Sequence, residues 1–308
     1  MNFEQNAFHE VTFDDLPNEV LQHIFSFLNH EDCLAASLVC RRWNCNAFQI
    51  RLVALDIRLD SPSFKSTVST LMASERNYRH LRVSTLGLPP EVFGKYCNCL
   101  ETFEMSFVEE EDFLYHLYRL KRLECLIIGY NVFPKEFNLS GPPYRSLKAI
   151  RAHHNEYASF TNFNTFISVI FPALAFLKLE DGIFDTHTQF RLSNLPLLEE
   201  LEIDTRHIID CHLLEDFKSL PKLRNVKLRC SELRKMDQID PDTRLGQVRS
   251  LEVAVGYGDV YLLRLVEMFP ALTRFVAEAK VEYLVDSVEA RKRIPNCHFE
   301  VFELKEMN

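Results

Sequence analysis

The chain has 308 residues, of which 47% are hydrophobic and 26% charged, so its composition is that of a folded globular protein rather than a disordered one. Its formal net charge is −9 and it contains no block of lysines and arginines, which argues against nucleic acid or a membrane as a partner. Nine scattered cysteines, without C-x-x-C or metal-type Cys/His spacing, favour reduced thiols in a cytoplasmic or nuclear protein without a metal or cofactor.

Residues 1–12 are expected to form a flexible N-terminus. Their first ten residues, MNFEQNAFHE, contain neither the basic region nor the apolar run of a secretory signal. Along the whole chain, no uninterrupted run approaches the roughly 18 apolar residues of a membrane-spanning helix.

Residues 13–50 predict three short helices. Asp14, Asp15 and Pro17 form a good helix start, because negative charge and proline are favoured in the first turn. One face of this first helix is apolar and carries Val20, Leu21, Ile24, Phe27 and Leu28. A second helix opens at 31–32 and a third begins at 40–43. Such a small unit cannot bury this apolar surface against itself, which predicts half of an interface.

The same stretch resembles the F-box motif. The matching residues are Leu16-Pro17-x-Glu19, Ile24, Leu28, Asp32-x-Leu34 and Ser37-x-Val39-Cys40-x-Arg42-Trp43, with Cys33 where a bulkier hydrophobe is common. The resemblance implies docking on a Skp-type adaptor, which joins the domain to a cullin scaffold. By position, it assigns the adaptor interface or its support to Leu16, Pro17, Ile24, Leu28, Leu34, Val39 and Trp43. The alternative is that some of these side chains pack only inside the helical unit or against the first repeat.

Residues 51–308 repeat one pattern about eleven times. The clearest copies are hexads with apolar residues at positions 1, 4 and 6, as in Leu174–Leu179 and Leu198–Ile203, and the others are looser versions. The first positions are 52, 81, 100, 123, 147, 174, 198, 223, 248, 272 and 299, with steps of 19 to 29 residues. Alternation at positions 4 and 6 predicts short strands. Between them, apolar residues three and four apart predict helices over 111–122, 163–171, 259–269 and 282–294.

This pattern resembles the leucine-rich repeat. Stacked strand–helix units predict an α/β fold in which a small all-helical F-box precedes a curved solenoid, with a parallel concave sheet and convex helices. The asparagine or cysteine common after the third apolar position is missing from most copies, which predicts irregular repeats.

Hexad positions 3, 5 and 7 are expected on the concave face, where they form a candidate substrate surface. The residues there are Arg151, His153, Phe176, Lys178, Glu180, Glu200, Glu202, Asp204, Lys227 and Arg229. Four acids between basic rows suit a charged peptide or protein face. The alternatives are an ordinary solvated sheet face, or binding through the loops or the last repeats around Glu278.

No catalytic set is evident in the sequence. The chain lacks a glycine-rich phosphate loop and G-x-S-x-G, and His153-His154 has no third ligand at metal spacing. An F-box followed by leucine-rich repeats resembles the non-catalytic substrate receptors of Skp–cullin–F-box ubiquitin ligases. That resemblance implies a protein substrate, of unknown identity, marked for proteasomal degradation. A non-degradative scaffold on the same adaptor is the alternative, and a receptor for a small ligand and an enzyme are further ones.

Overall fold

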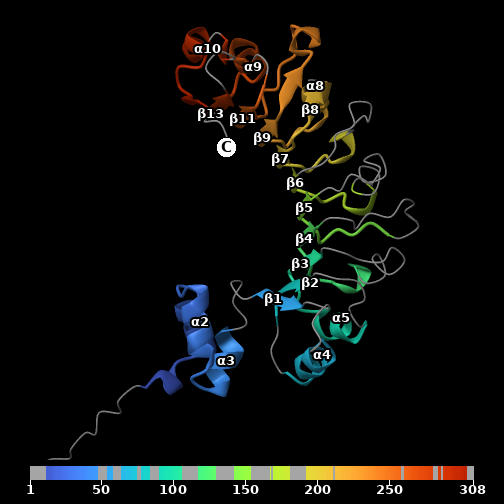
Figure 1. The fold of residues 1–308 in the computed structure, drawn as a ribbon, viewed down its shortest axis with the longest axis vertical. Coiled ribbons are helices and arrows are strands. Elements are labelled where there is room, and N and C mark those ends of the chain that lie inside the picture. The colour runs from blue at the N-terminus through green and yellow to red at the C-terminus, as the bar shows by residue number, and fades with distance from the viewer. Residues whose placement is uncertain are drawn as a thin grey trace, which may run out of the picture.

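The computed structural model describes residues 12–47, 54–57, 64–74, 78–83, 90–105, 117–129, 142–153, 167, 169–180, 192–210, 212–257, 260–279, 284–285 and 287–303. A group of short helices at the N-terminal end is followed by a long arc of strands (Figure 1). Apart from Thr12, the predicted flexible N-terminus lies outside the described residues.

The N-terminal region is helical, and its three predicted helices are confirmed. Its elements are the 3-10 turn η1 (Phe13–Asp15) and the helices α1 (Asn18–Phe25), α2 (His30–Ser37) and α3 (Arg41–Ala47). Asn29 caps α2, because its side-chain oxygen accepts a hydrogen bond of 2.9 Å from the backbone N–H of Asp32. Cys33, the small residue in a position where a larger one is common, is fully buried between these helices.

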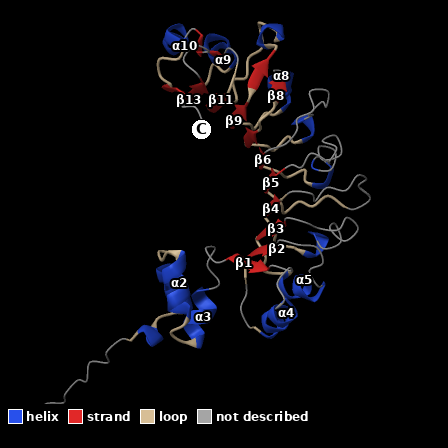
Figure 2. Cartoon of the chain, in the orientation of Figure 1, coloured by secondary structure: helices blue, strands red, loops and turns tan. Residues whose placement is uncertain are grey.

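The rest of the described chain is organised around one parallel sheet of eleven strands (Figure 2). In the sheet, each strand pairs with that of the next repeat. In this order the strands are β1 (Ala54–Ile57), β2 (His80–Val83), β3 (Thr102–Met105), β4 (Cys125–Ile128), β5 (Ala149–His153), β6 (Phe176–Glu180), β7 (Glu200–Asp204), β9 (Asn225–Cys230), β11 (Ser250–Val255), β13 (Arg274–Ala279) and β15 (His298–Glu303). The sheet does not close on itself, and its arrangement is consistent with a solenoid.

Alternation along the strands separates the core from an inner face. In β6, for example, Leu177 and Leu179 are buried while Phe176, Lys178 and Glu180 are half-buried on the opposite face. The strands line the inside of the arc, and the helices labelled α4, α5, α8, α9 and α10 lie outside it (Figure 1). The leucines of the hexads therefore form a core between the sheet and the outer elements.

Strand pairing corrects the frame of two predicted hexads. His80 pairs with Ala54 and Thr102, so the second hexad begins at Tyr78 rather than at Leu81. His298 pairs with Arg274, so the last one begins at 296 rather than at 299. In the corrected frame, the steps between repeats run from 22 to 27 residues, and the spacing of the repeats is more regular than the sequence pattern predicts.

The helices between the strands are short. They are α4 (Phe64–Ala73), α5 (Pro90–Tyr96), α8 (His212–Asp216), α9 (Leu262–Met268) and α10 (Ser287–Arg293), with 3-10 turns η2 (Leu192–Asn194), η3 (Phe217–Ser219) and η4 (Met236–Gln238). The predicted helices 259–269 and 282–294 thus exist but are shorter. The first half of 111–122 and most of 163–171 lie outside the described residues.

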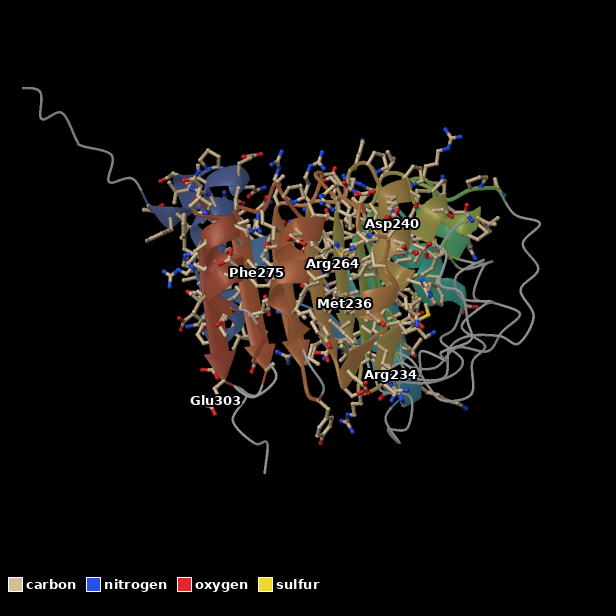
Figure 3. The ribbon with its side chains drawn as sticks, turned by 90° about the horizontal axis from the view of Figure 1, so that it is seen from above. Arg234, Met236, Asp240, Arg264, Phe275 and Glu303 are labelled. Carbon is tan, nitrogen blue, oxygen red and sulfur yellow. The ribbon has the colours of Figure 1, made fainter. Side chains whose placement is uncertain are left out.

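A second row of very short strands accompanies the last repeats and was not predicted. β8 (Ile208–Asp210) pairs in parallel with β10 (Glu232–Arg234), and β12 (Val260–Tyr261) with β14 (Leu284–Val285). Figure 3 shows the strands from above, with Phe275 and Glu303 on the C-terminal ones and Arg234 and Met236 near the β8–β10 pair.

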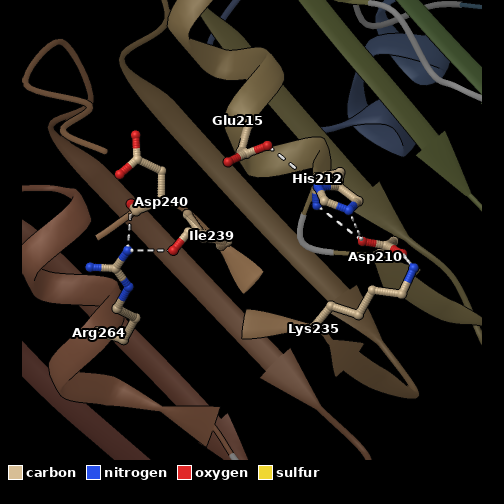
Figure 4. Close-up of polar contacts among 7 residues, drawn as sticks. All are labelled: Asp210, His212, Glu215, Lys235, Ile239, Asp240 and Arg264. Atoms are coloured by element: carbon tan, nitrogen blue, oxygen red, sulfur yellow. Dashed lines mark hydrogen bonds and ion pairs between the residues drawn. The ribbon is translucent and has the colours of Figure 1, made fainter. Parts of the chain in front are cut away.

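On the outer side, polar side chains link some neighbouring repeats. The guanidinium of Arg264, on α9, donates to the backbone carbonyls of Ile239, at 3.1 Å, and Asp240, at 2.7 Å, in the preceding repeat (Figure 4). The ammonium of Lys95, on α5, likewise donates to carbonyls at the end of α4, including that of Met72 at 3.1 Å. Such bonds satisfy carbonyl groups that the short helices and turns leave without partners.

Candidate functional site

Large apolar side chains are exposed on the N-terminal helices. They form a set that we call the N-terminal apolar surface: Phe13, Val20, Ile24, Phe27, Leu34, Leu38 and Val39. Leu38 is 83% exposed, Phe27 76% and Val39 63%. Several large apolar side chains left exposed on so small a unit mark a candidate site for binding another protein, since leaving them in water is unfavourable.

The predicted adaptor residues divide into two groups in the structure. Ile24, Leu34 and Val39 are exposed and belong to the N-terminal apolar surface, and Pro17 is exposed at the start of α1. Leu16, Leu28 and Trp43 are half-buried and pack against the core.

Trp43 is held by aromatic neighbours within the helical unit. Its ring meets those of Phe13 and Phe25 edge-on, with centroids 5.6 and 5.2 Å apart. Edge-to-face contacts of this kind add to the free energy gained by burial. The structure therefore gives Trp43 a supporting position beneath the exposed residues.

Four members of the surface were absent from the predicted set: Phe13, Val20, Phe27 and Leu38. Val20 and Phe27 lie on the predicted apolar face of the first helix, and this periodicity is the signal that identifies them. Leu38 follows α2 directly, and Phe13 precedes the motif. Leu38 stands four residues after Leu34, a helical spacing that signals a shared face, whereas Phe13 carries no periodic signal.

A buried amide network joins α1 to α3 and was also missed. Asn46 is buried, accepts from Gln22 Nε2 at 2.9 Å and donates to Asn18 Oδ1 at 3.2 Å. Arg42 Nε donates to the same Asn18 oxygen at 3.0 Å, and its guanidinium also bonds the carbonyl of Leu16. The network fixes the angle between α3 and α1, the helix that carries Val20 and Ile24 of the surface, since a buried polar group without its partners is costly.

The carboxylate of Asp15 caps the 3-10 turn η1 at the start of the helical unit. Hydrogen bonds from the backbone N–H and then the hydroxyl of Thr12, both 2.9 Å, hold the pKa of Asp15 below its ordinary value. Exposed acids also accompany the apolar surface, namely Glu19, Glu31 and Asp32. A partner with basic groups at the edge of its own apolar site would complement them.

The predicted substrate residues lie on the inner face of the sheet, in three rows set by the strand register. Arg151, Lys178, Glu202 and Lys227 occupy one row, and His153, Glu180, Asp204 and Arg229 the next. Phe176 and Glu200 belong to the third row. All ten residues are half-buried or exposed.

Three of the four acids in the predicted cluster, Glu180, Glu202 and Asp204, form ion pairs with cations of the same face. Glu180 bonds His153 Nδ1 at 2.6 Å and also Lys178, and Lys178 reaches Glu202 at 3.4 Å. The hydrogen bond to Glu180, opposed by burial, raises the pKa of Lys178. Asp204 pairs with Arg229 at 3.8 Å. The inner face therefore carries a ladder of paired charges, while Arg151 stands over the ring of Phe176 at 5.6 Å.

Outside these surfaces, a group of titratable residues surrounds Asp210 on the outer side. Asp210 faces His212 and Lys235, and His212 Nδ1 lies 3.3 Å from Glu215 (Figure 4). No group of three or more His, Cys, Asp or Glu able to hold a metal ion occurs among the described residues, and His154 lies outside them. Over the same part of the chain, no helix has the length and apolar character needed to cross a membrane.

Comparison with known proteins bears on the helical unit. No curated protein matches the chain. A family model described as F-box-like matches residues 13–53, a range that contains η1, α1, α2 and α3 and the whole N-terminal apolar surface. These residues therefore form an F-box-like domain, a type of domain that typically binds Skp-type adaptors.

Proposed function

We propose that the chain is the substrate-recognition subunit of a Skp–cullin–F-box ubiquitin ligase. The F-box-like domain docks on the Skp-type adaptor, and the strands that follow, as a leucine-rich-repeat solenoid, hold a target protein. The chain itself performs no bond chemistry in this proposal. It contributes proximity, by holding a target lysine near the ubiquitin carrier at high effective concentration. The complex acts in the cytoplasm or nucleus, and its targets are degraded.

The observation that carries the proposal is the N-terminal apolar surface within the F-box-like match. Seven large side chains stay exposed on a unit whose own core is already filled by Leu21, Phe25, Cys33, Ala36 and Ala47. Burial against a partner would stabilise a complex by about 25 cal/mol per Å² of apolar area. An F-box-like domain makes a Skp-type adaptor the partner to test first.

The shape of the remaining chain supports the second half of the proposal. Eleven described strands stack at intervals of 22 to 27 residues, which is within the range of leucine-rich repeats. A stacked solenoid offers a long inner face whose side chains do not contribute to the core. Half-buried side chains of both charges on that face suit a protein target.

Co-expression with a Skp-type adaptor tests the docking step. We expect a one-to-one complex with the wild-type chain and its loss with the double variant Leu38→Asp/Val39→Asp. Both residues are exposed, so the new carboxylates are hydrated in the free chain but would be buried unpaired in the interface. The matched control is Val288→Asp, a 70% exposed apolar residue on α10, which should leave the complex intact. Co-elution in size-exclusion chromatography is the readout, with far-UV circular dichroism to check folding.

A wild-type chain that stays soluble and unbound beside the adaptor would refute the docking step. The ligase role needs a second assay, in which adaptor, cullin and labelled ubiquitin are combined with candidate targets. Ubiquitin on a bound target only when the cullin is present supports the substrate receptor. Stable binding of a target that never acquires ubiquitin would instead indicate a scaffold on the same adaptor.

A further inference from the structure

Most cations on the inner face of the sheet are neutralised by carboxylates of the same face. Pairs with side-chain nitrogen and oxygen within 4 Å include Arg82–Glu104 at 2.8 Å, Lys178–Glu202 at 3.4 Å, Lys227–Glu252 at 2.8 Å, Arg229–Asp204 at 3.8 Å, Arg229–Glu278 at 3.9 Å and Arg274–Glu252 at 3.9 Å. These cations are already occupied, so they offer little net charge to a ligand.

Arg151 is the exception on this face. In the part of the chain that the structure describes, no carboxylate pairs with it, and its guanidinium stands over the ring of Phe176 at 5.6 Å. Across the sheet its neighbours are Ile127 and Lys178, and the ammonium of Lys178 is held by Glu180 and Glu202. Arg151 is exposed, so it presents one uncompensated positive charge to solvent.

Four side chains near Arg151 on this face are apolar or only weakly polar. Cys125 and Ile127 on β4, Ala149 on β5 and Phe176 on β6 share its face of the sheet, and all four are half-buried. We call these residues and Arg151 the Arg151 platform. Proximity of the guanidinium to Cys125 acts to lower the pKa of that thiol, although burial has the larger effect and raises it. A ligand on the platform would contact apolar surface and exclude water from the guanidinium, which strengthens an ion pair there.

We propose that the Arg151 platform binds a segment of the target protein in which an aspartate or glutamate stands next to a large apolar side chain. The carboxylate pairs with Arg151, whose planar guanidinium suits two parallel hydrogen bonds, and the apolar side chain covers Phe176 and Ile127. One free cation matches the single charge of a carboxylate better than the charge of −1.5 to −2 of a phosphate group. This inference rests on the proposed function and adds the chemistry of the target to it.

Selection from a displayed library of random peptides tests the inference on the full-length chain without adaptor. Peptides bound by the wild-type chain should be enriched in Asp or Glu beside Leu, Ile, Phe or Met. With Arg151→Glu, the same selection should favour Lys or Arg in place of the acid. Affinities of the selected peptides are then measured by fluorescence anisotropy. Arg151→Ala should weaken binding by about tenfold or more, as expected for loss of a charge-assisted hydrogen bond.

The control is Arg82→Ala, which removes a cation of the same face that is already paired with Glu104, and it should change affinity less than twofold. Peptides without an acidic preference, affinities unchanged by Arg151→Ala, or a library that yields no binder would each overturn the inference. Tighter binding after the acid is replaced by phosphoserine would also overturn it, in favour of a phosphate site. Because the adaptor is absent from the assay, failure here and failure of adaptor docking are separate results.

Discussion

At the scale of single residues, the environment of each cysteine sets its reactivity. Cys230, on β9, is 4% exposed, and burial raises the pKa of its thiol to about 12, although hydrogen bonds oppose the shift. Burial also raises the pKa of Cys33, inside the F-box-like domain. Cys40 is exposed and directly follows Leu38 and Val39 of the N-terminal apolar surface. Because the thiolate is the nucleophile, these thiols should differ strongly in alkylation rate.

We predict that iodoacetamide at pH 8 alkylates Cys40 and leaves Cys230 and Cys33 unmodified in the folded chain. If the adaptor covers the N-terminal apolar surface, it should slow the alkylation of Cys40 by about tenfold or more. Mass spectrometry of proteolytic peptides gives the alkylation rate of each cysteine. Cys297 lies in the last repeat, far along the sequence from the F-box-like domain, and its rate serves as the internal control. Equal rates for Cys40 with and without bound adaptor would place the interface elsewhere.

The sequence motif identified the F-box residues but not how each is used. Leu38 and Trp43 both belong to the stretch that resembles the motif, yet Leu38 is 83% exposed and Trp43 packs between Phe13 and Phe25. Periodicity tells which side chains share a helix face, but three short helices have several faces. The angles between the helices decide which face of each helix packs against the others. The hydrogen bonds of the buried Asn46 fix the angle between α1 and α3, and they give no strong signal in the sequence.

At the scale of elements, one carboxylate, that of Asp210, links the end of β8 to the start of α8 and to the residue that follows β10. Asp210 ends β8, accepts from the backbone N–H of His212 at 3.2 Å and pairs with Lys235 at 2.5 Å (Figure 4). Burial acts to raise the pKa of Asp210, but the hydrogen bonds from Lys235 and His212 outweigh it, so the pKa lies below its ordinary value.

We predict that this contact stabilises the fold above pH 4 and is lost in acid. The folded-state pKa of Asp210 is below the unfolded value of 3.8, so the stabilisation is present above 3.8 and disappears as the pH falls through the folded pKa. Asp210→Asn should therefore lower the free energy of unfolding by about 1 kcal/mol at pH 7 and by much less at pH 2.5. Urea titrations at the two pH values measure this, with the exposed Asp237→Asn as control. An equal loss at both pH values would show that the charge of Asp210 is not what matters.

The strands were predictable from the sequence, but the frame of the repeat was not always so. Leu81 and Leu86 fit the apolar pattern as first and last positions, yet pairing shows that Tyr78, Leu81 and Val83 form the hexad. A strand alternates every two residues, so several frames satisfy the same pattern, and only pairing with its neighbours selects one. The strands β8, β10, β12 and β14 escaped prediction because two or three residues carry too little periodicity.

On the inner face too, the sequence pattern predicted which side chains are exposed but not which of them pair. Alternation placed all ten predicted residues on the less buried side, which the burial of the strands bears out. Alternation could not show that Glu180 and Glu202 both pair with Lys178. Nor could it show that no carboxylate among the described residues pairs with Arg151. Which cation reaches which carboxylate depends on strand register and side-chain length, and these appear only when neighbouring repeats are stacked.

At the scale of the whole molecule, the chain is a series of units that contact mainly their neighbours. Each strand of the sheet pairs with those of the adjacent repeats. The side chains of Arg264 and Lys95 likewise donate hydrogen bonds to backbone carbonyls of the preceding repeat. In such an array the free energy of unfolding is close to a sum of repeat and interface contributions. A change at one end should therefore be felt weakly at the other.

We predict that the two ends of the chain respond separately to mutation. Phe275, on β13, is fully buried against Phe299 at a centroid distance of 5.2 Å, so Phe275→Ala should destabilise the C-terminal repeats by about 3–5 kcal/mol. Trp43 is the single tryptophan of the chain, and its fluorescence reports the F-box-like domain alone. In urea, the transition seen by far-UV circular dichroism should move to lower concentration or broaden, while that of Trp43 fluorescence stays in place.

The reciprocal variant completes the test. Phe25 lies 5.2 Å from Trp43 between ring centroids and is buried in the F-box-like domain, so Phe25→Ala should shift the fluorescence transition and leave most of the circular dichroism transition unchanged. If both variants instead move both transitions equally, the chain unfolds as one cooperative unit. Independent responses would mean that a target bound on the sheet and an adaptor bound on the helices each stabilise their own part, so that binding at one end requires no change at the other.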